Sequence, residues 1–215
     1  MSGPSKVIEK ILSDKNAFQT EPLKEFAESF LKKLPQEDVE SFVEDELKEI
    51  IHHHWQIAGS REKGDIHVDV HTKNLPYKSV KRSKVVVNIV CDDMAFTINS
   101  ISSELARLGY KLEKFLHPRL HHEDNNQKNK SAKRKSSSSM TKNPLREGTS
   151  HIFILLDSLA DSSARKELEE NLRTILHDVR LSNNDWPKML EFVKSAMVDL
   201  QNNSHVLPQP SLEEY

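Results

Sequence analysis

The stretch KVVVNIVCDDMAFTINSISSELARLGY, residues 84–110, decides the fold. It begins with an unbroken run of mostly β-branched residues, which is typical of a strand that is buried on both faces. Asp92 and Asp93 follow the strand, and apolar residues at helical spacing then predict a helix over residues 95–108. We expect one of the two acids to be the N-cap of this helix, and Gly109 to end it.

Further elements surround this stretch on both sides. The predicted strands span residues 66–70, 84–90, 110–120 (interrupted by Pro118) and 151–156, with a polar linker at 74–76. The other predicted helices span residues 5–14, 21–34, 37–57, 162–179 and 186–200, and Gly59 is expected to stop the third of these. The central order, strand–helix–strand–strand–helix with flanking helices, predicts a small α+β domain.

Composition narrows the class of protein. The 215 residues give room for one or two modest domains, and the formal charge of −2 argues against a nucleic-acid-binding chain. The start MSGPSKVIEK has no apolar signal region, and no apolar run approaches the length of a membrane span. Cys91 is the only cysteine, so no internal disulfide can form. We expect a cytoplasmic protein that binds neither membrane nor nucleic acid.

One long segment has a composition that cannot support a packed core. Residues 121–150 are rich in lysine and serine and almost free of large apolar side chains. The basic part, 128–142, could touch an acidic surface, but it lacks the interleaved aromatic residues that stack on bases. We therefore interpret residues 121–150 as a disordered, solvated loop, and we expect residues 202–215 to form a flexible tail.

The usual cofactor and metal motifs are missing. The five glycines form neither a dinucleotide-binding nor a phosphate-binding loop, so we expect no cofactor in this chain. His52, His53 and His54 are consecutive, so on a helix they point about 100° apart and cannot share one metal ion. We expect them at an exposed or half-buried helix end. The pairs His67/His71 and His121/His122 lack the spacing of a metal-binding helix, and we expect no metal site.

The residues that follow the central strand allow several interpretations. Cys91 is favoured as a small buried thiol over a nucleophile, because no base or orienting partner can be located. Asp92 and Asp93 are favoured as capping or first-turn acids, which the helix dipole stabilises. One acid would then remain free to contact a small molecule or a partner chain. Acid–base catalysis by the pair is the least favoured interpretation, and we expect no catalytic residues.

Several motifs resemble the large bacterial NAD-specific glutamate dehydrogenases. Residues 85–100 resemble the V-N-D-D-M-P-F-L-V-D-S signature near the start of that family. In chain order, the other similar segments are Trp55–Gly64 (W-x-x-A-x-x-R-x-x-G), Leu105–Gly109 (L-x-x-x-G), Phe115–Pro118 (a strand ending in His-Pro), Ser150–Ile152 (the return strand), Leu176–Arg180 (L-x-D-V-R) and Asp185–Pro187 (D-W-P). Together they extend over roughly residues 20–200.

The resemblance implies a fold for this chain and a separate domain for catalysis. It implies an ACT-like domain, in which a ferredoxin-like antiparallel sheet carries two helices on one face and follows an N-terminal helical hairpin or bundle. The expected segments are helices at 1–60, the ACT-like domain at 65–182, a C-terminal helix at 183–201 and the tail at 202–215. The oxidative deamination of glutamate to 2-oxoglutarate with NAD would belong to a downstream domain that is absent here.

The resemblance also implies a regulatory contact. ACT-type domains commonly hold a ligand at the first strand–helix junction, which corresponds here to the candidate residues Cys91, Asp92, Asp93, Met94, Asn99 and Ser100. The family has Asn, Pro and Asp where this chain has Cys91, Ala95 and Asn99. Expected partners are the rest of the dehydrogenase or its subunits, an amino-acid effector and further copies in a homo-oligomer. The alternatives are an interaction module without a small ligand and, less favoured, an independent enzyme.

Overall fold

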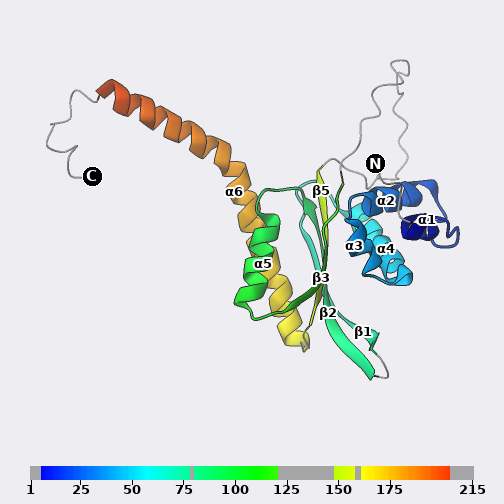
Figure 1. Cartoon of the computed structure of the whole chain (residues 1–215). Helices are drawn as coiled ribbons and strands as arrows, with labels where there is room; N and C mark the ends of the chain where they lie inside the picture. The colour runs from blue at the N-terminus through cyan, green and yellow to red at the C-terminus, as the bar shows by residue number, and fades with distance from the viewer. Residues whose placement is uncertain (1–5, 78–79, 121–147, 158–160, 204–215) are drawn as a thin grey trace, which may run out of the picture.

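A computed structural model describes residues 6–77, 80–120, 148–157 and 161–203 of the chain. A central antiparallel sheet is covered by helices on both faces, so the body has three layers (Figure 1). Most of the predicted loop 121–150 and of the predicted tail 202–215 lies outside the described residues. Residues 149 and 150 of that loop are part of a strand, which begins earlier than expected.

The sheet contains five strands: β1 (His67–Tyr77), β2 (Val80–Asp92), β3 (Leu112–Leu116), β4 (Arg119–Leu120) and β5 (Thr149–Leu156). Their order is β1-β2-β5-β3, and the short β4 also pairs with β5. All pairs are antiparallel. Pro118 separates β3 from β4, as the sequence predicts, because proline has no N–H to donate to a ladder.

The first two strands are longer than their apolar runs suggest. β1 and β2 pair without interruption from His67 opposite Val90 to Tyr77 opposite Val80. The prediction of a polar linker at 74–76 is therefore wrong, since these residues belong to β1. The error has a simple physical origin, because cross-strand pairing in a hairpin can extend strands through residues of low strand propensity.

Helices lie on both sides of the sheet (Figure 1). They are α1 (Lys6–Leu12), α2 (Glu21–Lys32), α3 (Gln36–Glu40), α4 (Glu44–Ser60), α5 (Thr97–Arg107) and α6 (Ser162–Asn203). The first four cover one face, while α5 and α6 cover the other. The α+β fold, with an antiparallel sheet and two helices on one face, is thus confirmed and is consistent with an ACT-like ferredoxin arrangement.

The alternation of side chains along β2 explains why its central residues are almost all apolar. Val85, Val87 and Ile89 belong to the core beneath α5 and α6, together with Ile101 and Leu172. Val86, between them in sequence, belongs to the second core beneath α1–α4. Successive side chains of a strand point to opposite faces, so a strand that is covered on both faces needs apolar residues at almost every position.

The predicted helix over residues 37–57 is in fact two helices. The backbone is extended at Val43, and the side chain of Glu46 accepts a hydrogen bond of 3.4 Å from the Val43 N–H. The three acids that begin α4 favour a helix start at this point because they interact well with the helix dipole. Gly59 does not stop α4, which runs to Ser60. The positive φ near this end of the helix belongs instead to Gly64, at 88°.

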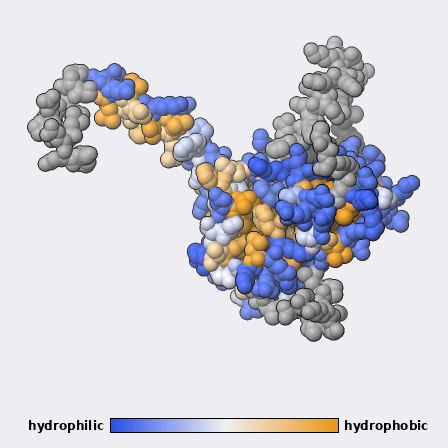
Figure 2. All heavy atoms as spheres, viewed as in Figure 1, coloured by the Kyte–Doolittle hydropathy of each residue, from blue (hydrophilic) through white to orange (hydrophobic). Residues whose placement is uncertain are grey.

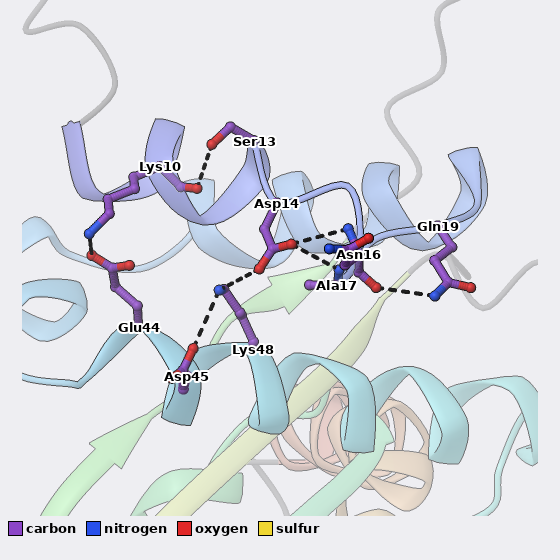
Figure 3. Close-up of polar contacts among 9 residues, drawn as sticks. All are labelled: Lys10, Ser13, Asp14, Asn16, Ala17, Gln19, Glu44, Asp45 and Lys48. Carbon is purple, nitrogen blue, oxygen red and sulfur yellow. Dashed lines mark hydrogen bonds and ion pairs between the residues drawn. The ribbon is translucent and has the colours of Figure 1, made fainter.

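The loop after α1 is fastened to α4 by charged side chains (Figure 3). The Asp14 carboxylate lies 2.7 Å from the Lys48 ammonium and accepts hydrogen bonds from the backbone N–H groups of Asn16 and Ala17. The pKa of Asp14 is lowered, mainly by the hydrogen bond from Lys48. These contacts fix the hairpin of α1 and α2 against α4.

The last helix is continuous, although two helices were predicted at 162–179 and 186–200. α6 spans 42 residues with Pro187 inside it. An interior proline removes its own N–H from the helical ladder and crowds the carbonyl four residues earlier, which bends a helix, but the turns on either side can remain helical. The C-terminal half of α6 projects away from the body (Figure 1).

Candidate functional site

The turn between β2 and α5 holds the candidate residues, but its geometry differs from the prediction. Asp92 is still the last residue of β2, and the N-cap of α5 is Phe96, without a side-chain capping hydrogen bond. Phe96 is 72% exposed and has a φ of 66°, a left-handed conformation that is unfavourable for a residue with a side chain. The prediction that Asp92 or Asp93 caps the helix is therefore wrong, because both acids are engaged elsewhere.

Asp92 is at the centre of a network that also contains Arg61, Gly64 and Arg180, three residues of the motifs described above. Its carboxylate forms an ion pair with Arg61, whose side chain is 4% exposed. It also accepts a hydrogen bond of 3.0 Å from the N–H of Gly64, and Arg180 donates to the carbonyl of Gly64. The network joins the end of α4, the start of β1, the end of β2 and α6. Removing one partner of a buried ion pair is costly, so these residues hold the corner of the fold together.

Asp93 is bonded to the start of β5. Its carboxylate accepts a hydrogen bond of 3.0 Å from Ser150 Oγ and lies 3.9 Å from the guanidinium of Arg119. Its backbone N–H donates to the carbonyl of Gly148. Asp93 therefore faces β4 and β5, away from the network around Asp92, and the two carboxylates do not act on a common point.

Asn183 connects the turn to α6. Its side-chain amide accepts a hydrogen bond from the Ala95 N–H and donates one to the Ala95 carbonyl, both at 3.1 Å. The same amide nitrogen lies 2.8 Å from the carbonyl of Val179, one turn earlier in α6. Any shift of the turn would therefore disturb the point at which α6 leaves the body.

The four remaining candidates point in different directions. Cys91 is fully buried beneath α5 and α6, and burial raises the pKa of its thiol to about 12, which disfavours the reactive thiolate. Met94 packs against the same core. Asn99 is exposed on the first turn of α5, and Ser100 is half-buried beside it. The six candidates share one corner of the sheet but do not converge on a single cavity.

A layer of polar side chains lies on the opposite face of the sheet, between the strands and α4. We call it the polar layer, and its members are His53, His54, Asp69, His71, Asn88 and His151. The Asp69 carboxylate lies 3.2 Å from His53 Nε2 and 2.8 Å from His71 Nδ1. Deeper in the layer, Asn88 donates to Asp69 at 3.3 Å, and His54 Nδ1 lies 3.3 Å from His151 Nδ1. The layer therefore reaches from the surface into the core.

Burial keeps the two inner histidines neutral. The pKa of His54 is lowered to about 3, first by burial and then by the nearby His53. The pKa of His151 is lowered well below its usual value by the same main cause. Among the described residues, His54 Nε2, His151 Nε2 and Asn88 Oδ1 are buried without a hydrogen-bond partner. Asn88 nevertheless lies close enough to the His54 ring to favour its charged form, as a secondary effect.

Some residues of the polar layer stand out in the sequence, but the sequence pattern alone could not show that they lie together. Asn88 interrupts the run of β-branched residues in β2, and it pairs with Asp69 of β1. His54 is not at an exposed helix end, as expected for the three histidines, but is fully buried six residues before the end of α4. His52 stacks on Phe18 instead. The three rings do point in different directions, as helical geometry requires.

Two open grooves flank the start of β1. One, of about 460 Å³, is lined mainly by Gly64–Ile66 and by the basic residues Arg173, His177 and Arg180 of α6. The other, of about 430 Å³, lies between α4 and β1 and includes His53, His67 and Arg173. Arg173 donates hydrogen bonds to the carbonyls of Ile66 and Val68, so much of its donor capacity is used within the fold.

Within the part of the chain that the structure describes, no group of three or more His, Cys, Asp or Glu side chains is placed to hold a metal ion. The described helices also include none of sufficient length and apolarity to cross a bilayer.

Comparison with known proteins identifies the family of this chain. No curated protein and no solved structure matches the chain. A family model described as the ACT1 domain of glutamate dehydrogenase matches residues 26–172. This match includes the sheet, the network around Asp92 apart from Arg180, and most of the helical layer over the polar layer. The chain therefore belongs to the glutamate dehydrogenase ACT1 domain family.

Proposed function

We propose that this chain is the regulatory and assembly segment of an NAD-dependent glutamate dehydrogenase whose catalytic domain lies elsewhere in the enzyme. Family membership supports a regulatory segment of a glutamate dehydrogenase. The carboxylates that could have served as acid and base are bonded to Arg61, Gly64 and Ser150. A general base must reach a proton on the substrate, and these two acids instead stabilise the fold.

One observation carries the regulatory part of the proposal. The two hydrogen bonds between Asn183 and Ala95 join the strand–helix turn to the origin of the projecting half of α6. We propose that an amino acid binds at the outer side of the turn, next to Asn99 and Ser100. Binding would favour one arrangement of the turn, and α6 would transmit that preference to the rest of the enzyme. An effector can shift such an equilibrium only by the difference in its affinity for the two states.

Calorimetry and thermal unfolding of the complete chain test this proposal. Each of the common amino acids is added at millimolar concentration, and the melting temperature is compared with that of the ligand-free chain. We expect at least one to raise the melting temperature, because a ligand that binds only the folded state stabilises it. No shift with any amino acid would refute the proposed effector and leave the assembly role.

A matched pair of variants localises any effect. Asn183→Ala removes the link between the turn and α6, while Asn184→Ala changes an exposed neighbour on the same helix. We expect hydrogen exchange in α6 to respond to the effector in the Asn184→Ala variant and not in the Asn183→Ala variant. Equal responses would show that the signal does not pass through Asn183.

The second candidate function is an interaction module without a small ligand. The observation in its favour is the set of large apolar side chains that the projecting half of α6 exposes, among them Trp186, Leu190 and Leu200. Monomeric proteins rarely expose a contiguous apolar surface of this kind without a partner for it. This candidate needs no effector, so a negative result in the calorimetric titration would favour it.

A further inference from the structure

The apolar face of α6 continues beyond the body of the protein. Leu172, Leu176 and Val179 are buried against the sheet. These three residues are separated by four and then three positions, and the same spacing continues through Asn183 into the projecting half of the helix. We call the apolar residues at these positions in the projecting half the distal stripe: Trp186, Leu190, Val193, Met197 and Leu200. These five side chains are between 40% and 63% exposed. Hydrophobic residues are visible along the projecting helix in Figure 2.

This spacing specifies the shape of the partner. A repeat of 3.5 residues keeps one side of a helix in contact with another helix along its whole length, as in a coiled coil. In a heptad labelled a to g, Leu190 and Met197 lie at position a, and Trp186, Val193 and Leu200 lie at position d. A sheet surface or a small ligand would not need such a strict repeat. The distal stripe is therefore built to pack against a helix.

We propose that the partner is the distal half of α6 from a second copy of this chain, packed antiparallel. In such a pair, a positions of one helix lie opposite d positions of the other. Leu190 then lies opposite Val193 of the second copy, and Trp186 lies opposite Met197. The indole is thus paired with a flexible thioether, a favourable combination, instead of with a second indole. Four apolar layers form, and the bodies lie at opposite ends.

The uncovered area reaches the lower end of the range for specific interfaces, which suits a pair that forms at micromolar concentration. With Met189 beside the stripe, six side chains leave roughly 600 Å² of apolar surface uncovered per copy, taking about 100 Å² for each. Two copies together would bury roughly 1,200 Å², above the approximately 1,000 Å² that a specific interface needs. The paired segment, residues 182–203, is roughly 33 Å long at 1.5 Å per residue.

The flanking positions contain no charge that opposes antiparallel pairing. Met189 and Ala196 would face each other on one side of the contact, and Pro187 would lie near Lys194 on the other. Asp185, Glu191 and Asp199 occupy outer positions that remain in water. Leu200 of the second copy would approach Asn183 and the exposed ring of Phe96, which would give that ring an apolar neighbour. Like charges at the contact would have disfavoured association.

Sedimentation equilibrium of the complete chain tests the pairing. We expect a monomer–dimer equilibrium at micromolar concentrations. Val193→Glu places two carboxylates at the centre of the contact and should raise the dissociation constant at least about tenfold. Phe192→Glu is the matched control, because Phe192 is 75% exposed on the same turn but outside the stripe. A chain that is monomeric at several hundred micromolar would overturn the proposal, as would equal effects of the two substitutions.

Disulfide trapping tests the antiparallel direction. Cys91 is buried and stays silent, so introduced cysteines report alone. Above the measured dissociation constant, a mixture of Trp186→Cys and Met197→Cys chains should form a mixed disulfide, whereas Trp186→Cys alone should not. In a parallel pair, Trp186→Cys alone would be trapped instead, and that result would overturn the proposal. The inference does not rest on an amino-acid effector, so its failure and the failure of the calorimetric test are separate outcomes.

Discussion

The two buried histidines of the polar layer should make the protein unusually sensitive to mild acid. His54 is completely buried, and its pKa is lowered to about 3. The pKa of His151 is also well below the usual value. In the unfolded chain both should titrate near pH 6.5. Below about pH 6.5, therefore, the unfolded state binds a proton at each histidine that the folded state disfavours, and for His54 this difference persists down to about pH 3.

The sign and size of the effect follow from proton linkage. A histidine with a depressed folded-state pKa contributes stability above its unfolded pKa and loses it as the pH falls. Each histidine costs about 1.4 kcal/mol per pH unit below 6.5. The free energy of unfolding should thus fall by about 2 kcal/mol for His54 between pH 6.5 and 5, and His151 adds to this loss in the same direction. Domains are commonly stable by only about 5–15 kcal/mol.

Other titrating groups do not reverse this result. The pKa values of His67 and His117 are also lowered, mainly by burial, so they act in the same direction. Asp69 has a pKa that is lowered chiefly by its hydrogen bond from His53. Its contribution is present above the unfolded value of about 4 and is lost only below it, outside this window.

Urea denaturation at half-unit intervals of pH from 7.5 to 5 measures the effect. We expect the slope of the free energy of unfolding against pH to correspond to more than one proton at its acid end, since His151 adds to the proton of His54. His54→Leu should reduce the slope by about one proton. A free energy of unfolding that is flat across this range, or a slope that His54→Leu leaves unchanged, would refute the reasoning.

Three further predictions concern the corner of the sheet. Arg61→Ala leaves Asp92 without its buried partner, so denaturation should show a loss of about 3 kcal/mol, whereas Lys63→Ala, nearby in sequence, should cost less than about 0.5 kcal/mol. Phe96→Gly should raise the free energy of unfolding by about 1 kcal/mol, because glycine adopts a positive φ without strain and the exposed ring packs little. A lower free energy of unfolding in this variant would show that the ring stabilises the fold. Cys91 should resist alkylation at pH 8 until the chain unfolds, and rapid labelling of the folded chain would contradict its buried position.

The fold was predictable where local pattern and burial agree. The apolar run in β2 predicted a strand covered on both faces, and the helices on both sides of the sheet explain it. Gly109 does follow α5, with a φ of 77°. The two errors have different origins. The ladder between β1 and β2 absorbs the expected linker at 74–76, so long-range pairing overrides a local signal there. α6 continues through Pro187 although the surrounding side chains are exposed, because one proline does not end the helical turns on either side.

The candidate site was predictable in position but not in its contacts. The sequence located Asp92 and Asp93 correctly at the end of a strand, but it could not show that Arg61 and Ser150 would meet them from distant parts of the chain. The polar layer was harder to predict. A single Asn88 within an apolar strand is a weak signal until its neighbours across the sheet are known.

Steady-state kinetics of a full-length dehydrogenase that contains this segment test the central claim most directly. The claim is that the segment regulates the enzyme and takes no part in its chemistry. With Asn183→Ala, and Asn184→Ala as the control, we predict turnover without effector within about twofold of the unmodified enzyme. The response to an amino-acid effector should weaken only in the first variant. A loss of turnover in a folded, assembled Asn183→Ala enzyme, or an unchanged effector response, would contradict the account.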